Sequence, residues 1–246
     1  MRHVDWNLSA RLDQLFMKLF AAEVDTTLNI LLDVSASMSF GSPSKFNYAR
    51  QLAAALAVIG LSNMDRIAVT LFDSRLGDGL PFLKGKGHLH TVLKFLSDCK
   101  PGSESSSSGS SFTTPFTDAV AKRASPGILV VISDLLGDDE TLSALQALRS
   151  RQHDVIVVQI LADEEHTPTL DGVLKLIDSE SGRVLKTTVD AELRELYQDR
   201  LQLHLRGIEQ TCRNSGFTYL CSTTSVALED IILRDLQYGR YGAGHQ

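Results

Sequence analysis

Cysteine is scarce in this sequence, and the three that it has, Cys99, Cys212 and Cys221, form no C-x-x-C pair. The number is odd and the spacing is wide, which is not the pattern of a disulfide scaffold. We therefore expect buried thiols in a reducing cytoplasm, and a single Cys212–Cys221 bridge is the less favoured alternative.

The sequence also lacks a basic excess and a long apolar run. Lys and Arg number 24 against 30 Asp and Glu, which gives a formal net charge of −6. Nucleic acids and anionic membrane surfaces call for a basic face, so neither is expected as a partner. The longest apolar run lies within residues 51–61, shorter than the roughly 20 residues of a membrane span. Residues 1–6 have no apolar signal core. We expect a cytoplasmic protein with no membrane span in this chain.

Several catalytic motifs are missing as well. The chain has no G-x-S-x-G nucleophile elbow, no G-x-G-x-x-G and no phosphate-binding G-x-x-x-x-G-K-[ST] loop. A serine hydrolase of the α/β type and a motif-dependent nucleotide-binding enzyme therefore have no support.

What is present is a regular alternation of strand and helix patterns over 246 residues. Short apolar runs predict buried strands, and three- and four-residue apolar spacing predicts the helices between them. This order favours an α/β fold with a mostly parallel sheet and right-handed crossovers. Strands are predicted at 28–32, 66–72, 79–83, 127–132, 154–161 and 217–221, and helices at 42–60, 90–97, 140–151, 191–213 and 226–236.

Residues 172–189 interrupt this alternation with two short strand patterns around a polar loop, which predicts an inserted β-hairpin. The helix that follows, 191–213, has an apolar stripe that includes Tyr197, Leu201 and Ile208. We expect this stripe to pack on the core, and a groove for a partner is the alternative.

The residues most indicative of function are polar and follow two of the buried strands. Asp33, Ser35 and Ser37 come directly after the first strand, and Asp134 ends the 127–132 strand pattern. In an open parallel sheet, ligands bind beyond the carboxyl ends of strands, where strand order reverses. Two carboxylates with nearby hydroxyls form an all-oxygen site suited to Mg²⁺, with Mn²⁺ or Ca²⁺ as alternatives. For the other three residues alone, a capped turn after a strand is the alternative, and Asp134 strengthens the metal site over it.

The run LLDVSASM resembles the metal-ion-dependent adhesion site of von Willebrand factor A domains. In that family a threonine from a second loop and an aspartate from a third complete the D-x-S-x-S motif. The resemblance assigns the aspartate to Asp134 and the threonine to Thr114, before Pro115, with Thr113 as the alternative. It also implies a doubly wound sheet of order 3-2-1-4-5-6 with one antiparallel edge strand, in a single domain over 25–240.

Three further runs accompany LLDVSASM: VDW near the start, SKFNYA and VVISDLL. With these runs, the sequence is similar to a bacterial family of uncharacterised proteins. Members of that family are usually encoded beside MoxR-type AAA+ ATPases. The resemblance marks residues 1–24 as an N-terminal family segment, expected to be a truncated part of a longer extension. It implies a non-enzymatic module that binds a protein partner through its metal. The partner is expected to be a MoxR-type ATPase or its client and to supply an acidic residue, in assembly or maturation of other proteins.

A haloacid-dehalogenase-like phosphatase is the rival interpretation. Such an enzyme also has an aspartate at the end of its first strand, here Asp33, and Asp134, Asp138 and Asp139 resemble its acidic metal loop. It would, however, need a second acid two residues after the first to protonate the leaving group, and this chain has Ser35 there. We also expect the run Asp163-Glu164-Glu165 to be a solvated acidic turn rather than a second cation site.

Overall fold

The computed structural model describes residues 26–73, 76–102, 127–136, 153–177 and 183–232. Its centre is a six-stranded sheet of order β3-β2-β1-β4-β5-β8. All neighbouring strands pair in parallel except β2 and β3, which are antiparallel at one edge. The predicted order and its antiparallel edge are confirmed. The strands are β1 (Thr27–Asp33), β2 (Arg66–Phe72), β3 (Leu76–Lys84), β4 (Gly127–Ser133), β5 (His153–Leu161) and β8 (Thr218–Thr223).

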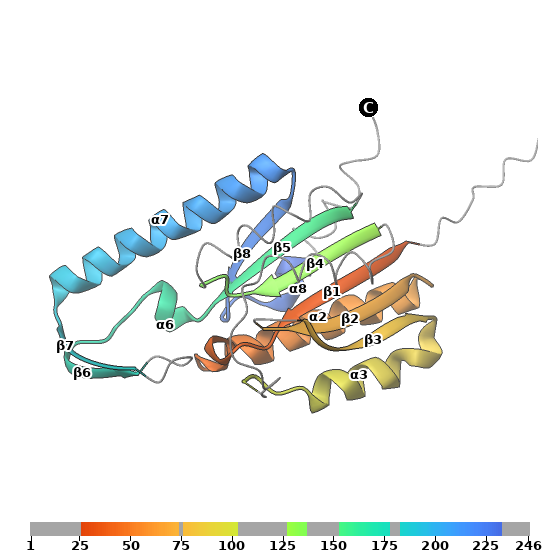
Figure 1. Ribbon diagram of the computed structural model, residues 1–246, viewed down its shortest axis with the longest axis horizontal. Helices are drawn as coiled ribbons and strands as arrows, with labels where there is room; N and C mark the ends of the chain where they lie inside the picture. Colours follow the sequence, from red (N-terminus) through yellow and green to blue (C-terminus); the bar gives the residue numbers. More distant parts are fainter. Residues whose placement is uncertain (1–25, 74–75, 103–126, 137–152, 178–182, 233–246) are drawn as a thin grey trace, which may run out of the picture.

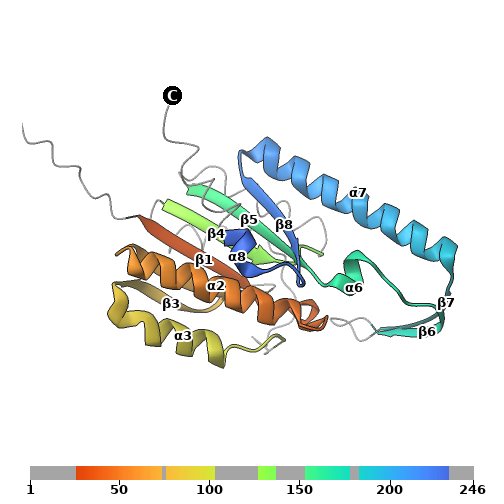
Figure 2. The ribbon, with the colours of Figure 1, turned by 180° about the vertical axis from the view of Figure 1, so that it is seen from behind.

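Helices cover both faces of this sheet (Figures 1 and 2), so its central strands are buried on both sides. All seven residues of β1 are buried: Ile30 and Leu32 pack with the helices of one face, and Leu31 packs toward the other. This explains the continuous apolar runs that predicted the strands. On the first face lie α2 (Lys45–Ser62), α3 (Leu89–Asp98) and α8 (Leu228–Asp230), and on the second lies α7 (Ala191–Ser215).

Helix α2 is the main helix of the first face and leads away from the carboxyl end of β1. Ser44 is its N-cap residue, and the Ser44 Oγ accepts a hydrogen bond from the Asn47 N–H. A Cβ atom on Gly60 would lie 2.4 Å from Ile67 Cδ1, so the helix packs closely on β2 at this point. The predicted apolar stripe is confirmed from Phe46 to Leu56, whereas Ile59 is exposed because it lies off the buried face.

Short elements line the carboxyl edge of the sheet. The 3-10 helix η1 (Ala36–Ser39) follows β1, and the single-turn α6 (Asp163–His166) follows β5. A second short 3-10 helix, η2 (Lys86–His88), lies at the opposite, amino end of the parallel strands, because the antiparallel β3 ends beside the first residue of β2; it precedes α3.

The inserted hairpin is confirmed as β6 (Gly172–Ile177) paired with β7 (Val184–Val189). It forms a separate two-stranded sheet and lies at the end of the molecule where α7 begins (Figures 1 and 2). Along α7, core packing is confirmed for Leu201 and Ile208 but is wrong for Tyr197, which is 41% exposed because this end of the helix extends past the sheet.

Two predicted helices have different outcomes. The helix predicted at 140–151 lies outside the described residues. The last helix, predicted at 226–236, is described as α8 and two further residues up to 232. Within the described ranges, no helix combines the length and the apolar character needed to cross a membrane.

Candidate metal centre

Asp33 and Asp134 meet at the carboxyl edge of the sheet, at the junction of its two central strands. Asp33 is the last residue of β1, and Asp134 follows the last residue of β4. The two strands are direct neighbours, with Leu32 opposite Ile132. Both aspartates are buried, at 6% and 3% exposed. The structure thus confirms that the two acids predicted from separate segments lie in one place.

Asp33 is held by neutral hydrogen-bond donors. Its Oδ1 accepts from the Ser35 backbone N–H at 2.8 Å, and its Oδ2 accepts from the Ser133 hydroxyl at 2.5 Å. Burial, and then the negative charge of Asp134, raise the pKa of Asp33 from 3.8 to about 6, although these hydrogen bonds oppose the rise. Without a cation, the ionised form of Asp33 is therefore costly in the folded protein.

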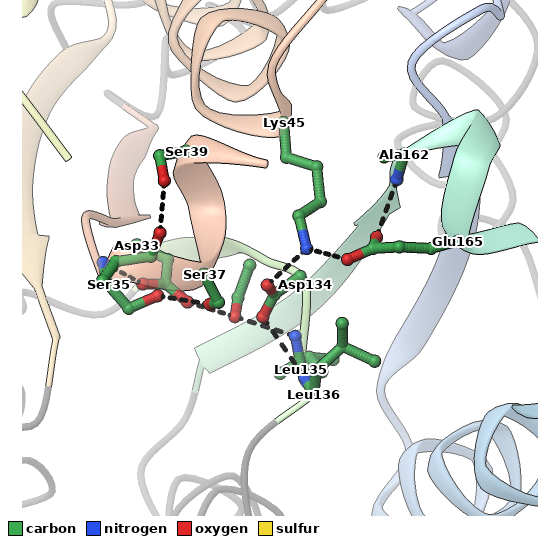
Figure 3. A network of polar contacts seen from close by, with 12 residues as sticks. Asp33, Ser35, Ser37, Ser39, Lys45, Asp134, Leu135, Leu136, Ala162 and Glu165 are labelled. Carbon is green, nitrogen blue, oxygen red and sulfur yellow. Dashed lines mark hydrogen bonds and ion pairs between the residues drawn. The ribbon is translucent and has the colours of Figure 1, made fainter. Parts of the chain in front are cut away.

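The hydroxyls of Ser35 and Ser37 lie close to each other beside Asp33. η1 curls the chain directly after Asp33, and the Ser35 Oγ and Ser37 Oγ lie 3.0 Å apart. Ser39, two residues further, instead donates its hydroxyl hydrogen bond to the Ala36 carbonyl oxygen at 2.6 Å. Only the first two of these three serines therefore present their hydroxyls to each other beside Asp33 (Figure 3).

The backbone after Asp134 is fixed from several directions. Leu135 has a φ of 51°, a left-handed conformation that is unusual for a branched side chain. The Asp134 carbonyl oxygen accepts from Gln159 Nε2 at 2.7 Å, and Gln159 in turn accepts from the Tyr219 hydroxyl. The Leu135 carbonyl oxygen lies 2.8 Å from His204 Nε2 on α7. β5, β8 and α7 therefore all help to position this aspartate.

Lys45 is a site residue that the sequence analysis missed. It is the first residue of α2, and its side chain is fully buried. Its Nζ donates to Asp134 Oδ2 at 2.8 Å and to Glu165 Oε1 at 2.6 Å (Figure 3). The same ammonium lies 5.9 Å from the centre of the Phe40 ring. A buried lysine is costly unless it is paired, so these two carboxylates account for its position.

Glu165 corrects another expectation. Residues 163–165 were predicted to be a solvated acidic turn, but the Glu165 side chain is only 13% exposed and pairs with Lys45. Its second oxygen, Oε2, accepts from the Ala162 N–H at 2.9 Å and so caps α6. Asp163 and Glu164 are exposed, as expected. Glu165 reaches Lys45 because α6 follows β5 and lies beside the first turn of α2.

One sequence signal could have identified Lys45. A cation in the first turn of a helix is unfavourable, because that end carries a partial positive charge. Lys45 directly follows the N-cap Ser44 and occupies such a position. A lysine there favours a nearby acidic partner, but nothing in the sequence says which acid. The spacing to Asp134 is 89 residues and to Glu165 is 120 residues.

The described donors suit a hard divalent cation. Carboxylate and hydroxyl oxygens are the ligands that Mg²⁺ and Ca²⁺ prefer. The site offers such oxygens from Asp33, Ser35, Ser37 and Asp134, and the Ser133 hydroxyl lies beside Asp33. Within the described ranges, no cluster of three or more His, Cys, Asp and Glu with the spacing of a metal site occurs, so hydroxyls are needed to complete a ligand set. The predicted ligand Thr114 and its alternative Thr113 lie outside the described residues, and so do Asp138 and Asp139.

Two sequence relatives have no activity in their names. The chain is 26% identical over 251 residues to "Uncharacterized protein Rv1480" of Mycobacterium tuberculosis, with 100% of this chain and 78% of that protein covered. "Uncharacterized protein MAV169" of Mycobacterium avium is 29% identical over 117 residues, which cover 48% of this chain and 69% of that protein.

Solved structures share the fold. "Conserved hypothetical protein BatB" from Bacteroides thetaiotaomicron superposes with a TM-score of 0.56 at 15% identity, covering 87% of this chain and 98% of that one. An "aerotolerance-related membrane protein" from Bacteroides fragilis gives 0.54 at 18% identity, with 86% and 98% covered. Among family profiles, the one described as "Protein of unknown function DUF58" matches residues 1–206. Because this match spans most of the chain, the protein belongs to the DUF58 family.

Proposed function

We propose that this chain is a protein-interaction module that binds its partner through a divalent cation, with Mg²⁺ as the first candidate. The observation that carries the proposal is the meeting of Asp33 and Asp134, with the paired hydroxyls of Ser35 and Ser37, at the carboxyl edge of neighbouring strands. The raised pKa of Asp33 supports it, since burial and the nearby charge of Asp134 make the ionised Asp33 carboxylate costly until a positive charge is supplied beside it.

Each side chain has a defined part in this proposal. Asp33 supplies the anionic ligand, and Ser35 and Ser37 supply neutral oxygens that leave most of the cation's charge uncompensated. Asp134, already bound to Lys45 and to the Leu136 N–H, acts directly or through water. Ser133 orients the Asp33 carboxylate. A bound cation would supply an electrophilic position for an acidic side chain, and such charge-assisted contacts anchor interfaces.

The family resemblance suggests the partner. We propose a MoxR-type AAA+ ATPase or its client, and we propose that this chain acts in the cytoplasm as an adaptor or co-chaperone in assembly or maturation of other proteins. The contact would need one aspartate or glutamate on the partner.

The rival function, a haloacid-dehalogenase-like phosphatase, has less support. Ser35 stands where that reaction needs an acid to protonate the leaving group. Turnover of a generic phosphate ester with Mg²⁺ that disappears in Asp33→Asn would favour the phosphatase over a binding module.

The proposed function is tested by titrating the proposed partner, a MoxR-type AAA+ ATPase, against the full chain, with Mg²⁺ and with EDTA. We expect binding in Mg²⁺ only, and loss of binding in Asp33→Ala. Ser39→Ala is the matched control, because Ser39 lies in the same short helix but bonds to the Ala36 carbonyl oxygen. Equally tight binding in EDTA and in Asp33→Ala would show that the metal centre is not the contact.

A further inference from the structure

The Lys45 ammonium gives the candidate metal centre a resident positive charge on one side only. It contacts Asp134 at 2.8 Å and Glu165 at 2.6 Å, and its side chain is fully buried. Asp33, by contrast, receives its hydrogen bonds from the Ser35 N–H and the Ser133 hydroxyl, which are neutral. Of the two acids that meet at the strand ends, one is already paired with a cation.

Because Asp134 is already paired with the Lys45 ammonium, direct binding of a divalent cation to the same carboxylate is unfavourable. A divalent ion bound directly to that carboxylate would lie close to the ammonium, and like charges a few ångströms apart in a buried site repel strongly. Lys45 cannot easily withdraw, because it occupies the first turn of α2 with no exposed side-chain area.

Glu165 stabilises the lysine in this position. It contributes a second carboxylate to the same ammonium, and its own Oε2 is fixed by the Ala162 N–H. The three charged groups therefore form a connected unit, drawn together in Figure 3, that joins α2, the loop after β4 and α6. Exchange of the lysine for a metal ion would disrupt all three elements.

We propose that Lys45 is a specificity-determining residue that competes with the divalent cation for Asp134 and so sets a low intrinsic cation affinity. The cation is then held mainly from the side of Asp33, Ser35 and Ser37. This inference rests on the proposed function, in that it concerns the same cation.

The test is calorimetric titration of Mg²⁺, repeated with Mn²⁺, into the full chain and its variants, with no partner present. Lys45→Met removes the competing charge, and we expect the dissociation constant to fall at least about tenfold. Because this variant leaves two buried acids unpaired, the double variant Lys45→Met/Glu165→Gln is measured as well. It removes one positive and one negative charge together, and we expect tighter binding there too. Lys94→Met, at an exposed lysine of α3, is the control and should bind like the wild type.

The outcomes separate this inference from the proposed function. Measurable wild-type binding that is unchanged in both Lys45 variants overturns the role of Lys45 and leaves the metal-dependent function standing. Binding in the double variant but not in the wild type supports the role of Lys45 and contradicts the metal-dependent function. No binding in any protein overturns both. Tighter binding in the variants than in a wild type that itself binds supports both.

Discussion

The two aspartates at the centre of this molecule lie on neighbouring strands but have opposite surroundings. Asp33 is surrounded by neutral donors, and its pKa is raised to about 6 by burial and by the charge of Asp134. Asp134 is paired with a buried ammonium, and its side chain also accepts from the Leu136 N–H. One site can therefore hold, side by side, an acid whose charge is balanced by a buried ammonium and an acid whose charge is not balanced. The uncompensated one, Asp33, is where an added cation should have the larger effect.

The largest expected effect comes from removing the compensating charge. Lys45→Met leaves Asp134 and Glu165 buried without their common partner, so the free energy of unfolding should fall by about 3–5 kcal/mol. Urea unfolding followed by circular dichroism measures this. Lys45→Met/Glu165→Gln should recover part of the loss, and Lys94→Met should lie within about 0.5 kcal/mol of the wild type. A loss no greater than that of Lys94→Met would contradict the ion-pair description.

The second prediction concerns the uncompensated acid in EDTA. The folded protein holds the proton of Asp33 more tightly than the unfolded chain does, so stability should decline as pH rises from about 4 to about 6. The rise in pKa from 3.8 to about 6 corresponds to a free energy on the order of 3 kcal/mol.

Asp33→Asn removes this titration, because an amide stays neutral and its Oδ1 can still accept from the Ser35 N–H. Above pH 6 the variant should be the more stable protein, and the difference between the two should shrink toward pH 4. A difference that does not change across this pH range would show that the pKa of Asp33 is not raised. Unfolding curves of both proteins at each pH provide the measurement.

A smaller effect is expected from Mg²⁺ itself. If the dissociation constant lies near 0.1–1 mM, then 1 mM Mg²⁺ should stabilise the wild-type fold by ~0.4–1.4 kcal/mol. Thermal melting with Mg²⁺ and with EDTA checks this, and Asp33→Asn is the variant that should lose the difference. Identical midpoints for the wild type, together with calorimetry that detects no binding, would exclude the metal centre.

The smallest effect compares two serines of η1. Ser37→Ala removes a hydroxyl that lies beside Ser35, but water can take its place. The free energy of cation binding should therefore weaken by about 1 kcal/mol or less. Ser39→Ala should leave the affinity unchanged, since that hydroxyl bonds to a backbone oxygen of its own turn. Equal losses in the two variants would show that the Ser35–Ser37 pair has no special part in binding.

The sequence by itself determined the strand positions, the fold class and the Asp33 side of the site. Continuous apolar runs predict strands buried on both faces, and a motif whose members are two residues apart depends only on a local curl of the chain. The closeness of the Ser35 and Ser37 hydroxyls to each other beside Asp33 is therefore almost a local property, and so is the hairpin between residues 172 and 189.

Only the tertiary structure decided how the other side is compensated. Lys45 lies 89 residues before Asp134 and 120 residues before Glu165, and no pattern in any one of the three segments specifies the others. Their meeting depends on strand order: β4 lies between β1 and β5, so the loop after β4 meets both the first turn of α2 and α6. The same holds for α7, where the length of the sheet decides that Leu201 is buried and Tyr197 is exposed. Pairings of this kind depend on long-range packing, which periodicity and spacing along the chain do not encode.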